Sequence, residues 1–516
     1  MTEGSSALLR RLQQLQCHFT WDLKKDVDLK NLSTRLQDHI KLQLGQRGAV
    51  ARSYSFLAYV RYLQNQREEA LSLLNQSEET IRERHGDESE RRLIVTYGDM
   101  AWLKYHAGDF AQSQSYCKKV EDILVKYPTG SSASLLPEVY GEQAWTYLKL
   151  SKSYYLQAVD SFRKALEIQT DDIEWNAGYA IALFRTEEWV LENLQETEEP
   201  PSIKQLHFAL ELNPDDAVLQ SMLAVKLGAY KKYKEAEGLL KKALKTDPDN
   251  PHVSRYVGKY FRNHHQLDES IDMLERALKR TTQSSFIHHQ LALCYKRKKI
   301  AEQSHKPFSN QREVRCWRRC CIREFEMAVK IKPSFHLAWA DLALLYAEER
   351  NFRRYSSVES SSDSCLFARR MFVIITIISL FLRAEEIFQQ CLVKLPECDE
   401  SLSQAIHQRF GDFHYHHKRN EAQAIVHYTK GLLIPLKKYE KKLCAKKLKK
   451  IAERRLSRNP GDGEALALLG QVARAEGNRK EAADFYEKAL NCDKDNEEYL
   501  SALCELRLEL QGSSSD

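Results

Sequence analysis

A period of 34 residues constrains the fold of this chain more than any other feature. Pro214 and Pro248 are one period apart, and the segment 217–250 aligns without gaps with the segment 251–284. Small residues recur at the eighth, twentieth and twenty-seventh positions of both segments. Such a period, with small residues where helices must approach closely, is typical of a helix–turn–helix unit that repeats. We therefore expect a solenoid of stacked helix pairs.

The same pattern extends along most of the sequence. Nearly every segment has apolar residues at the i, i+3, i+4, i+7 spacing of an amphipathic helix, and no run of alternating β-branched residues indicates a sheet. Asn213-Pro214 and Asp247-Pro248 fit turns between repeats, because proline cannot continue a helix and Asx residues cap the next one. The sequence thus predicts an all-α tetratricopeptide-repeat superhelix, with repeats that begin near Arg52, Arg91, Pro137, Glu174, Ala217, Pro251, Ser285, His336, Leu402 and Asp462.

Composition bounds the compartment and the partners. Of 516 residues, 43% are apolar and 29% are charged, as in a folded helical protein, and the net charge is only +6. A nucleic-acid site therefore requires a local concentration of positive charge. The first residues lack an uninterrupted apolar core, and the 12 cysteines lack the spacing of a disulfide framework. We expect a cytoplasmic protein with reduced cysteines.

Two insertions break the period. The spacing from Thr282 to Pro333 is 17 residues longer than one repeat, which places a basic insertion at roughly 297–319. The following repeat is 29 residues too long, which matches residues 355–383. Their 12-residue apolar run, 371–382, is shorter than the roughly 20 residues of a membrane span, so we expect a foreign segment that loops out and no membrane insertion. We divide the chain into N-terminal, central and C-terminal repeat subdomains at 1–245, 246–400 and 401–516.

Short motifs from the start to the tail of the chain carry a family resemblance. They lie at 17–21 (CHFTW), 57–60 (LAYV), 177–181 (AGYAI), 285–290 (SFIHHQ) and 501–508 (SALCELRL). Through them the chain, except for 355–383, resembles the interferon-induced proteins with tetratricopeptide repeats, and the tail is most like the fifth member of that family. The resemblance implies a cytosolic antiviral effector and not an enzyme. It implies a clamp whose central basic pocket holds the 5′ end of single-stranded viral RNA and so keeps it from translation.

One predicted first helix carries a basic stripe. Arg255, Lys259 and Arg262 follow one another at i, i+4 and i+7, so they share one face, and first helices line the concave surface of such repeats. One repeat later, His289 and Lys296 occupy the positions of Arg255 and Arg262. Stacked like charges repel, and guanidinium and ammonium groups suit phosphate oxygens. The stripe indicates a bound anion, with a solvated basic face as the alternative.

The family's RNA-binding residues can be transferred where this sequence matches. The resemblance implies a set of cations, rings and amides made up of Arg35, Lys149, Tyr155, Arg185, Arg255, Tyr256, Lys259, Arg262, His289 and Gln290. In this set the cations neutralise the terminal phosphates, while the rings and the amide contact the first nucleotides by stacking or hydrogen bonds. Trp145 would close the pocket near the 5′ end, unless it belongs to the core.

Three departures from the relatives bear on the ligand. His39 stands where relatives have Gln, and residues 40–45 differ from relatives that accept a methylguanosine cap. Asn31 stands where some relatives use an acidic residue to hold a metal. We therefore expect recognition of a 5′-triphosphate more than of a cap, and no metal or other cofactor. The histidines of 414–417 and the cysteines of 316–321 also lack paired metal-ligand spacing.

The rival interpretation is a protein-interaction scaffold that binds an acidic peptide or a related tetratricopeptide-repeat protein. The basic residues extend from Arg35 to His289, which is long for a peptide clamp, and Tyr155 and Tyr256 favour RNA. The stretch 437–455 has ten Lys or Arg against two Glu, and it either lines an RNA exit channel or solubilises a surface helix. No P-loop, GxSxG or HExxH motif occurs, so nothing indicates catalysis.

Overall fold

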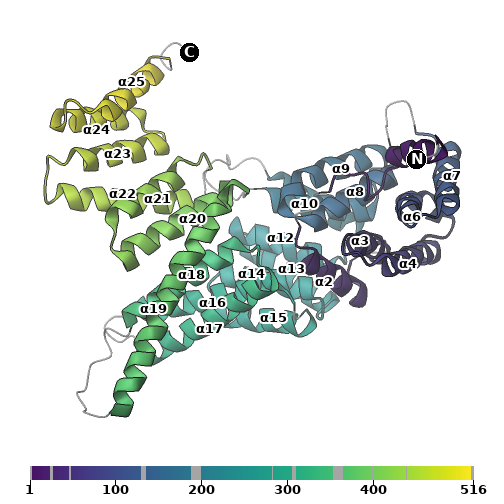
Figure 1. Cartoon of the computed structure of the whole chain (residues 1–516), viewed down its shortest axis with the longest axis horizontal. Helices are drawn as coiled ribbons and strands as arrows, with labels where there is room; N and C mark the ends of the chain where they lie inside the picture. The colour runs from purple at the N-terminus through teal and green to yellow at the C-terminus, as the bar shows by residue number, and fades with distance from the viewer. Residues whose placement is uncertain are drawn as a thin grey trace. The chain divides into compact units, whose positions relative to one another are not determined.

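All regular secondary structure among the described residues is helical. This computed structural model describes residues 3–23, 27–45, 48–129, 135–187, 199–281, 283–304, 310–352, 364–397, 400–436 and 439–512. These residues contain no β-strand, as the apolar spacing predicted. They form two compact units (Figure 1). Unit 1 is built from 1–188, 193–317 and 330–332, and unit 2 from 318–329 and 333–516.

Unit 1 consists of consecutive helix pairs preceded by two N-terminal helices. Its helices are α1 (Glu3–Gln14), α2 (Leu29–Lys41), α3 (Ala49–Leu63), α4 (Arg67–His85), η1 (Gly86–Glu88), α5 (Ser89–Arg92), α6 (Ile94–His106), α7 (Phe110–Lys126), α8 (Pro137–Leu150), η2 (Lys152–Tyr154), α9 (Tyr155–Ile168), α10 (Ile173–Thr186), α11 (Pro201–Leu212), α12 (Ala217–Ala229), α13 (Tyr233–Thr246), α14 (Pro251–Asn263), α15 (Leu267–Arg280) and α16 (Ser285–Ser304). Helix α17 (Gln311–Ile331) belongs partly to each unit.

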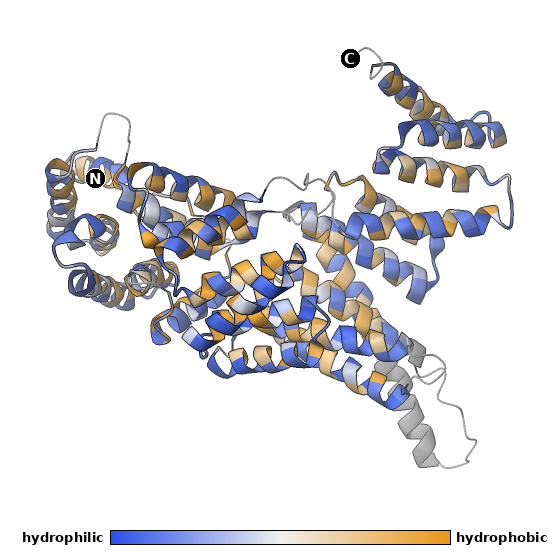
Figure 2. Ribbon diagram, turned by 180° about the vertical axis from the view of Figure 1, so that it is seen from behind, coloured by the Kyte–Doolittle hydropathy of each residue, from blue (hydrophilic) through white to orange (hydrophobic). Residues whose placement is uncertain are grey.

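Unit 2 continues the same architecture. Its helices are α18 (His336–Phe352), α19 (Ser364–Val393), η3 (Leu395–Glu397), α20 (Glu400–Asp412), the π-helix η4 (Phe413–Lys418), α21 (Glu421–Leu433), α22 (Tyr439–Leu456), α23 (Gly463–Glu476), α24 (Arg479–Cys492) and α25 (Glu497–Gly512). Apolar and hydrophilic residues alternate along most of the helices of both units (Figure 2). This alternation is the sequence spacing of helices that bury one face.

The small residues of the period explain why the helices pair. Ala224, Ala236 and Ala243 are fully buried, where α12 packs against α13. In the next repeat Gly258 occupies the first of these positions, and a Cβ added there would come within 2.9 Å of the Leu274 side chain. Larger residues would separate the helices, because protein interiors leave no room for extra atoms. The period predicted these contacts correctly.

The described parts of both insertions are helical, which the sequence did not predict. The basic insertion lengthens α16 and α17 to 20 and 21 residues, against 13 for α12. The predicted loop at 355–383 is wrong for residues 364–383, which are continuous with the rest of the 30-residue α19. This part contains neither proline nor glycine, so nothing in it interrupts a helix. Residues 353–363 lie outside the described ranges. Among the described residues, no helix is long and apolar enough to cross a membrane. The three-subdomain division stays a prediction.

Candidate nucleic-acid interface

Four cations from four helices of unit 1 lie together: Arg35 of α2, Lys149 of α8, Arg185 of α10 and Arg255 of α14. We call them the basic cluster. Arg35 Nη2 donates to the Lys149 carbonyl oxygen at 3.1 Å, and the charges of Arg185 and Arg255 both act on Arg35. Residues separated by more than 200 positions therefore share one site. All four belong to the set that the family resemblance implied.

The ends of the first helices position these cations. Lys149 lies in the last turn of α8, and Arg185 lies in the last turn of α10, where positive charge interacts favourably with the helix dipole. Asp172 caps the N-terminus of α10 by accepting from the Trp175 backbone N–H at 2.8 Å. At the other end, Arg185 Nη1 donates to the Leu148 carbonyl oxygen of α8 at 3.2 Å. Neighbouring first helices thus hold their cationic ends side by side.

Burial and neighbouring positive charges weaken the protonated state of two members of the cluster, Lys149 and Arg35. Burial, followed by repulsion from Arg52 and Arg35, lowers the pKa of Lys149 to about 7. Arg35 is exposed to solvent, yet the surrounding protein and the neighbouring arginines lower its pKa. Within the described part of the chain, no carboxylate lies within 4.0 Å of any of the four charged groups. Cations kept in this state without a counter-ion are favourably placed for a bound anion.

Two tyrosines stack against the cluster. The Arg185 guanidinium carbon lies 5.5 Å from the ring centroid of Tyr155, and that of Arg255 lies 4.8 Å from the ring centroid of Tyr256. Burial raises the pKa of Tyr256, but Arg255, Arg185 and Lys259 outweigh this effect and bring it down to about 8. The site therefore already stabilises negative charge on a phenol oxygen, as it would on a phosphate.

The basic stripe predicted on α14 continues from this cluster. Burial and the neighbouring cations Arg262, Arg255 and Lys226 lower the pKa of Lys259 to about 8. Its ammonium lies 5.3 Å from the ring centroid of Phe184, on α10. Burial and Arg297 lower the pKa of Arg262 to about 10. The stripe is thus partly desolvated, which argues against a purely solvated basic face.

Helix α16 approaches α14 close to the predicted register. Arg255 lies against Phe286, 5.2 Å from its ring centroid, one helical turn before His289. His289 and Gln290 are each only 6% exposed, and Gln290 Nε2 lies 3.4 Å from His289 Nδ1. The structure places both residues beneath the surface next to the stripe, and their contact with nucleotides stays a prediction.

Three further residues lie near the cluster: His39, which the sequence had marked as a departure from relatives, and His252 and Lys332, which sequence reasoning missed. The rings of His39 and His252 are 5.5 Å apart, and burial and nearby cations hold both pKa values well below the usual range. Lys332 also lies near the cluster, because burial and the positive charge of Arg35 lower the pKa of Lys332. His252 lies three residues before Arg255 and so on the same face of α14, which is a signal that spacing could have found. Lys332 is remote in the sequence and gave none.

Trp145 is half-buried on α8, one turn before Lys149. The Arg52 guanidinium carbon of α3 lies 5.2 Å from its ring centroid, and Arg52 Nη1 is paired with Glu174 Oε2 at 2.6 Å. Glu174 also accepts from the Gly48 backbone N–H. The Trp145 face nearest α3 is therefore covered by a side chain of the chain itself.

The basic stretch of unit 2 differs from this site. On α22, Lys447 pairs with Asp412 at 3.1 Å, Lys449 with Glu476 at 2.8 Å and Arg455 with Asp462 at 2.8 Å. Compensated charges of this kind favour the surface-helix interpretation over an RNA channel. Among the described residues of the whole chain, no group of histidine, cysteine, aspartate and glutamate side chains has the arrangement of a metal site.

Comparison with known proteins decides the family. No protein-family model matches the sequence. The chain is 34% identical to the human protein named antiviral innate immune response effector IFIT1, over 94% of this chain and 96% of the relative. The chain belongs to the interferon-induced proteins with tetratricopeptide repeats. A second relative in this family, the human interferon-induced protein with tetratricopeptide repeats 2, is 30% identical over 95% of this chain and 97% of its own length.

Solved structures of the family share the fold. The structure of a human IFIT1 dimer with PPP-AAAA covers 95% of this chain and all of the relative, with a TM-score of 0.76 at 32% identity. A human IFIT1 dimer with m7Gppp-AAAA gives a TM-score of 0.78 at 33% identity, with the same coverage. The tetratricopeptide-repeat superhelix and the family are thereby confirmed. The closest resemblance to the fifth member stays a prediction.

Proposed function

We propose that this protein binds the 5′-triphosphate end of single-stranded RNA at the basic cluster. The observation that carries the proposal is the convergence of Arg35, Lys149, Arg185 and Arg255 with no carboxylate within ion-pair distance among the described residues. A triphosphate supplies several negative charges in a compact group, which matches four cations drawn from four helices. Guanidinium groups bind phosphate oxygens in pairs, and the lysine adds a point charge.

The tyrosines support RNA over an acidic peptide. Tyr155 and Tyr256 both lie against cluster arginines, so their rings adjoin the site proposed for the phosphates. Single-strand binders use such rings as platforms for successive bases, and each stacked base contributes about 1–3 kcal/mol. A carboxylate-rich peptide would use the cations but would leave the rings without a role. The neutral His39 and His252 rings extend the same non-cationic surface.

The cellular role follows from this ligand. An RNA whose 5′ end is held in the protein is unavailable for translation, which fits a cytoplasmic antiviral effector that acts by sequestration and performs no catalysis. Human IFIT1 is named an antiviral effector, and its dimer with PPP-AAAA supports a triphosphate RNA as the ligand of this relative's fold. The IFIT1 dimers also support a second tetratricopeptide-repeat chain of the family as a protein partner.

A gel shift with one RNA sequence in three forms tests the proposal. The RNA carries a 5′-triphosphate, a 5′-hydroxyl or a cap, and an acidic peptide serves as a competitor in a fourth lane. We expect the triphosphate form to bind at least about tenfold more tightly than the hydroxyl form. Equal binding of all three forms would contradict end recognition. Displacement of the RNA by the peptide at comparable concentration would favour the scaffold instead.

A further inference from the structure

Helices α8 and α10, each the first helix of its repeat, carry an acidic, an apolar and a basic side chain in the same order along one face. Glu142, Trp145 and Lys149 follow at i, i+3 and i+7 on α8, and so share one face. On the neighbouring α10, Glu174 is followed after two turns by Ile181 and after three by Arg185. Each stripe therefore runs from an acid through an apolar side chain to a cation. The cationic ends belong to the basic cluster.

This order continues the proposed triphosphate site toward the acids. A group joined to the far end of a bound triphosphate would extend from the cations over Trp145 toward Glu174. A planar base suits that path, since an indole stacks on a ring and a carboxylate accepts from ring N–H groups. A cationic, methylated base would be attracted further, by the face of the indole.

In this chain the Arg52 side chain already contacts both the face of Trp145 and the carboxylate of Glu174. Its guanidinium lies over the Trp145 ring at 5.2 Å, and it is paired with Glu174 at 2.6 Å. Both partners of the pair are about nine-tenths buried, which makes a chance surface contact an insufficient explanation. Gly48 permits this packing, because a Cβ there would come within 2.5 Å of the Arg52 guanidinium and 2.7 Å of the Glu174 carboxylate. A planar cation is thus built into the position that a planar base would require.

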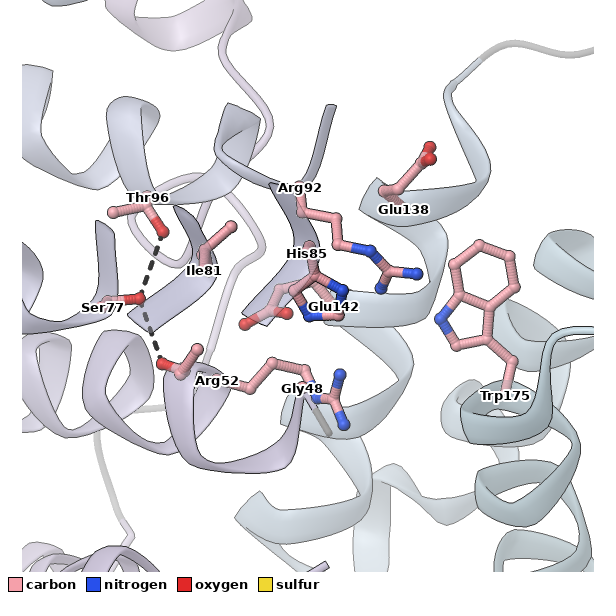
Figure 3. Close-up of a pocket in the computed structure, with 11 residues that line it drawn as sticks. Gly48, Arg52, Ser77, Ile81, His85, Arg92, Thr96, Glu138, Glu142 and Trp175 are labelled. Atoms are coloured by element: carbon pink, nitrogen blue, oxygen red, sulfur yellow. Dashed lines mark hydrogen bonds between the residues drawn. The ribbon is translucent and has the colours of Figure 1, made fainter. Parts of the chain in front are cut away.

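Space lies behind Arg52. Its side chain lines a pocket together with Gly48, Glu142 and Trp175, and Figure 3 shows its guanidinium reaching toward the α10 side of that pocket. The pocket is small and partly open to solvent. Arg52 therefore both lines this pocket and covers one face of Trp145, so shortening its side chain would uncover that face next to the pocket.

We infer that Arg52 is a specificity-determining residue, which favours an uncapped triphosphate by excluding a guanosine joined to that triphosphate. The inference rests on the proposed function. It differs from a purely structural role of the ion pair, because it concerns the choice between two RNA ends and not stability. Glu174 and Trp145 then provide the surface that Arg52 denies to the added base.

The test compares dissociation constants for one RNA with a 5′-triphosphate, a Gppp end or an m7Gppp end. In the wild type we expect both capped forms to bind at least about tenfold more weakly than the triphosphate form. In Arg52→Ala the ratio of capped to triphosphate dissociation constants should fall about tenfold, since one base–aromatic stack contributes on this scale. Arg52→Ala combined with Trp145→Ala should lose most of that gain.

Arg92→Ala is the matched control. Arg92 lines the same pocket and pairs with Asp172 of α10 at 3.5 Å, but it does not stack on Trp145. The capped-to-triphosphate ratio of this variant should equal that of the wild type. If Arg52→Ala fails to fold, the neutral double variant Arg52→Ala/Glu174→Gln removes the uncompensated carboxylate and should shift the ratio in the same direction.

Two outcomes would overturn the inference while leaving the proposed function intact. One is a wild type that binds capped and triphosphate RNA equally but hydroxyl RNA weakly. The other is a folded Arg52→Ala protein, or the double variant, that retains the wild-type ratio. If the wild type does not prefer a triphosphate over a hydroxyl, the proposed function fails, and the role of Arg52 fails with it.

Discussion

The basic cluster of unit 1 and the paired arginines of unit 2 stand in opposite electrostatic surroundings. In unit 2, Arg409 lies 3.0 Å from Asp341 and Arg474 lies 2.6 Å from Glu509, and these carboxylates raise the pKa of each arginine. In unit 1, burial and like charges lower the pKa of Arg35 and Lys149. One chain thus uses the same residue types in two ways. The paired arginines of unit 2 stabilise the packing of its helices. The crowded cations of the basic cluster are instead placed to bind an anionic ligand.

The number of basic residues in a segment therefore does not locate the site. The helix α22 has the densest run of lysine and arginine in the chain, but much of its charge is compensated by neighbouring helices. The four cluster residues are scattered over more than 200 positions and are not compensated in this way. Loss of partners in unit 2 should therefore cost stability, and loss of cations in unit 1 should cost binding.

The largest effect should come from breaking a buried pair in unit 2. Asp341 is only 1% exposed, and Asp341→Asn leaves the Arg409 charge without its main counter-ion. We expect the free energy of unfolding of unit 2 to fall by about 3 kcal/mol. Urea denaturation, followed by a spectroscopic signal from unit 2, measures this loss. Glu505→Gln removes one carboxylate that pairs with the partly exposed Arg474, and it should lower the free energy of unfolding by less than about 1 kcal/mol. Equal losses would remove the distinction between buried and exposed pairs.

Cluster cations should affect binding instead. Arg185→Ala and Arg255→Ala should each weaken binding of triphosphate RNA by about 2 kcal/mol, because each removes a charge-assisted contact to phosphate. Filter-binding titrations measure this loss, and Arg474→Ala in unit 2 serves as the control, with less than about threefold change. Wild-type affinity in both cluster variants would refute the site.

Part of this contrast was accessible from the sequence. The period predicted the helix pairs, and α14 spacing together with the family motifs predicted Arg185, Arg255 and Lys149. The compensation of Lys447 and Lys449 on α22 was not accessible, because Asp412 and Glu476 lie on other helices whose packing no local pattern reveals. Arg52 was missed for the same reason, since its partners Trp145 and Glu174 are about 90 and 120 positions away.

The contrast also predicts how binding depends on pH. Lys149 and Lys259 have pKa values near 7 and near 8 without ligand, and a bound triphosphate favours their charged forms and raises both values. Affinity is therefore greatest below pH 7 and falls as pH rises toward 9, by about tenfold overall. Lys149→Arg stays charged throughout this range and should flatten the profile. A flat wild-type profile would show that these ammonium groups do not contact the ligand.

The smallest effect concerns stability in the absence of RNA. Lys149→Met removes a desolvated charge that faces other cations, so we expect the free energy of unfolding to rise by about 0.5–1 kcal/mol while RNA affinity falls. Lys449→Met is the matched control on α22, where the lysine is paired with Glu476, and it should leave stability unchanged or slightly lower. Destabilisation by Lys149→Met would mean that this lysine serves the fold rather than a ligand.

The most direct test asks which unit contacts the 5′ end. A triphosphate RNA with a photoreactive thiouridine as its first nucleotide is crosslinked to the full chain, and the modified peptides are identified by mass spectrometry. We predict crosslinks within α8 to α10 and within α14, around Tyr155 and Tyr256, and a strong reduction when the RNA carries a 5′-hydroxyl. Crosslinks concentrated on α22, or equal yields from the two RNA ends, would contradict the assignment of the triphosphate to the basic cluster of unit 1.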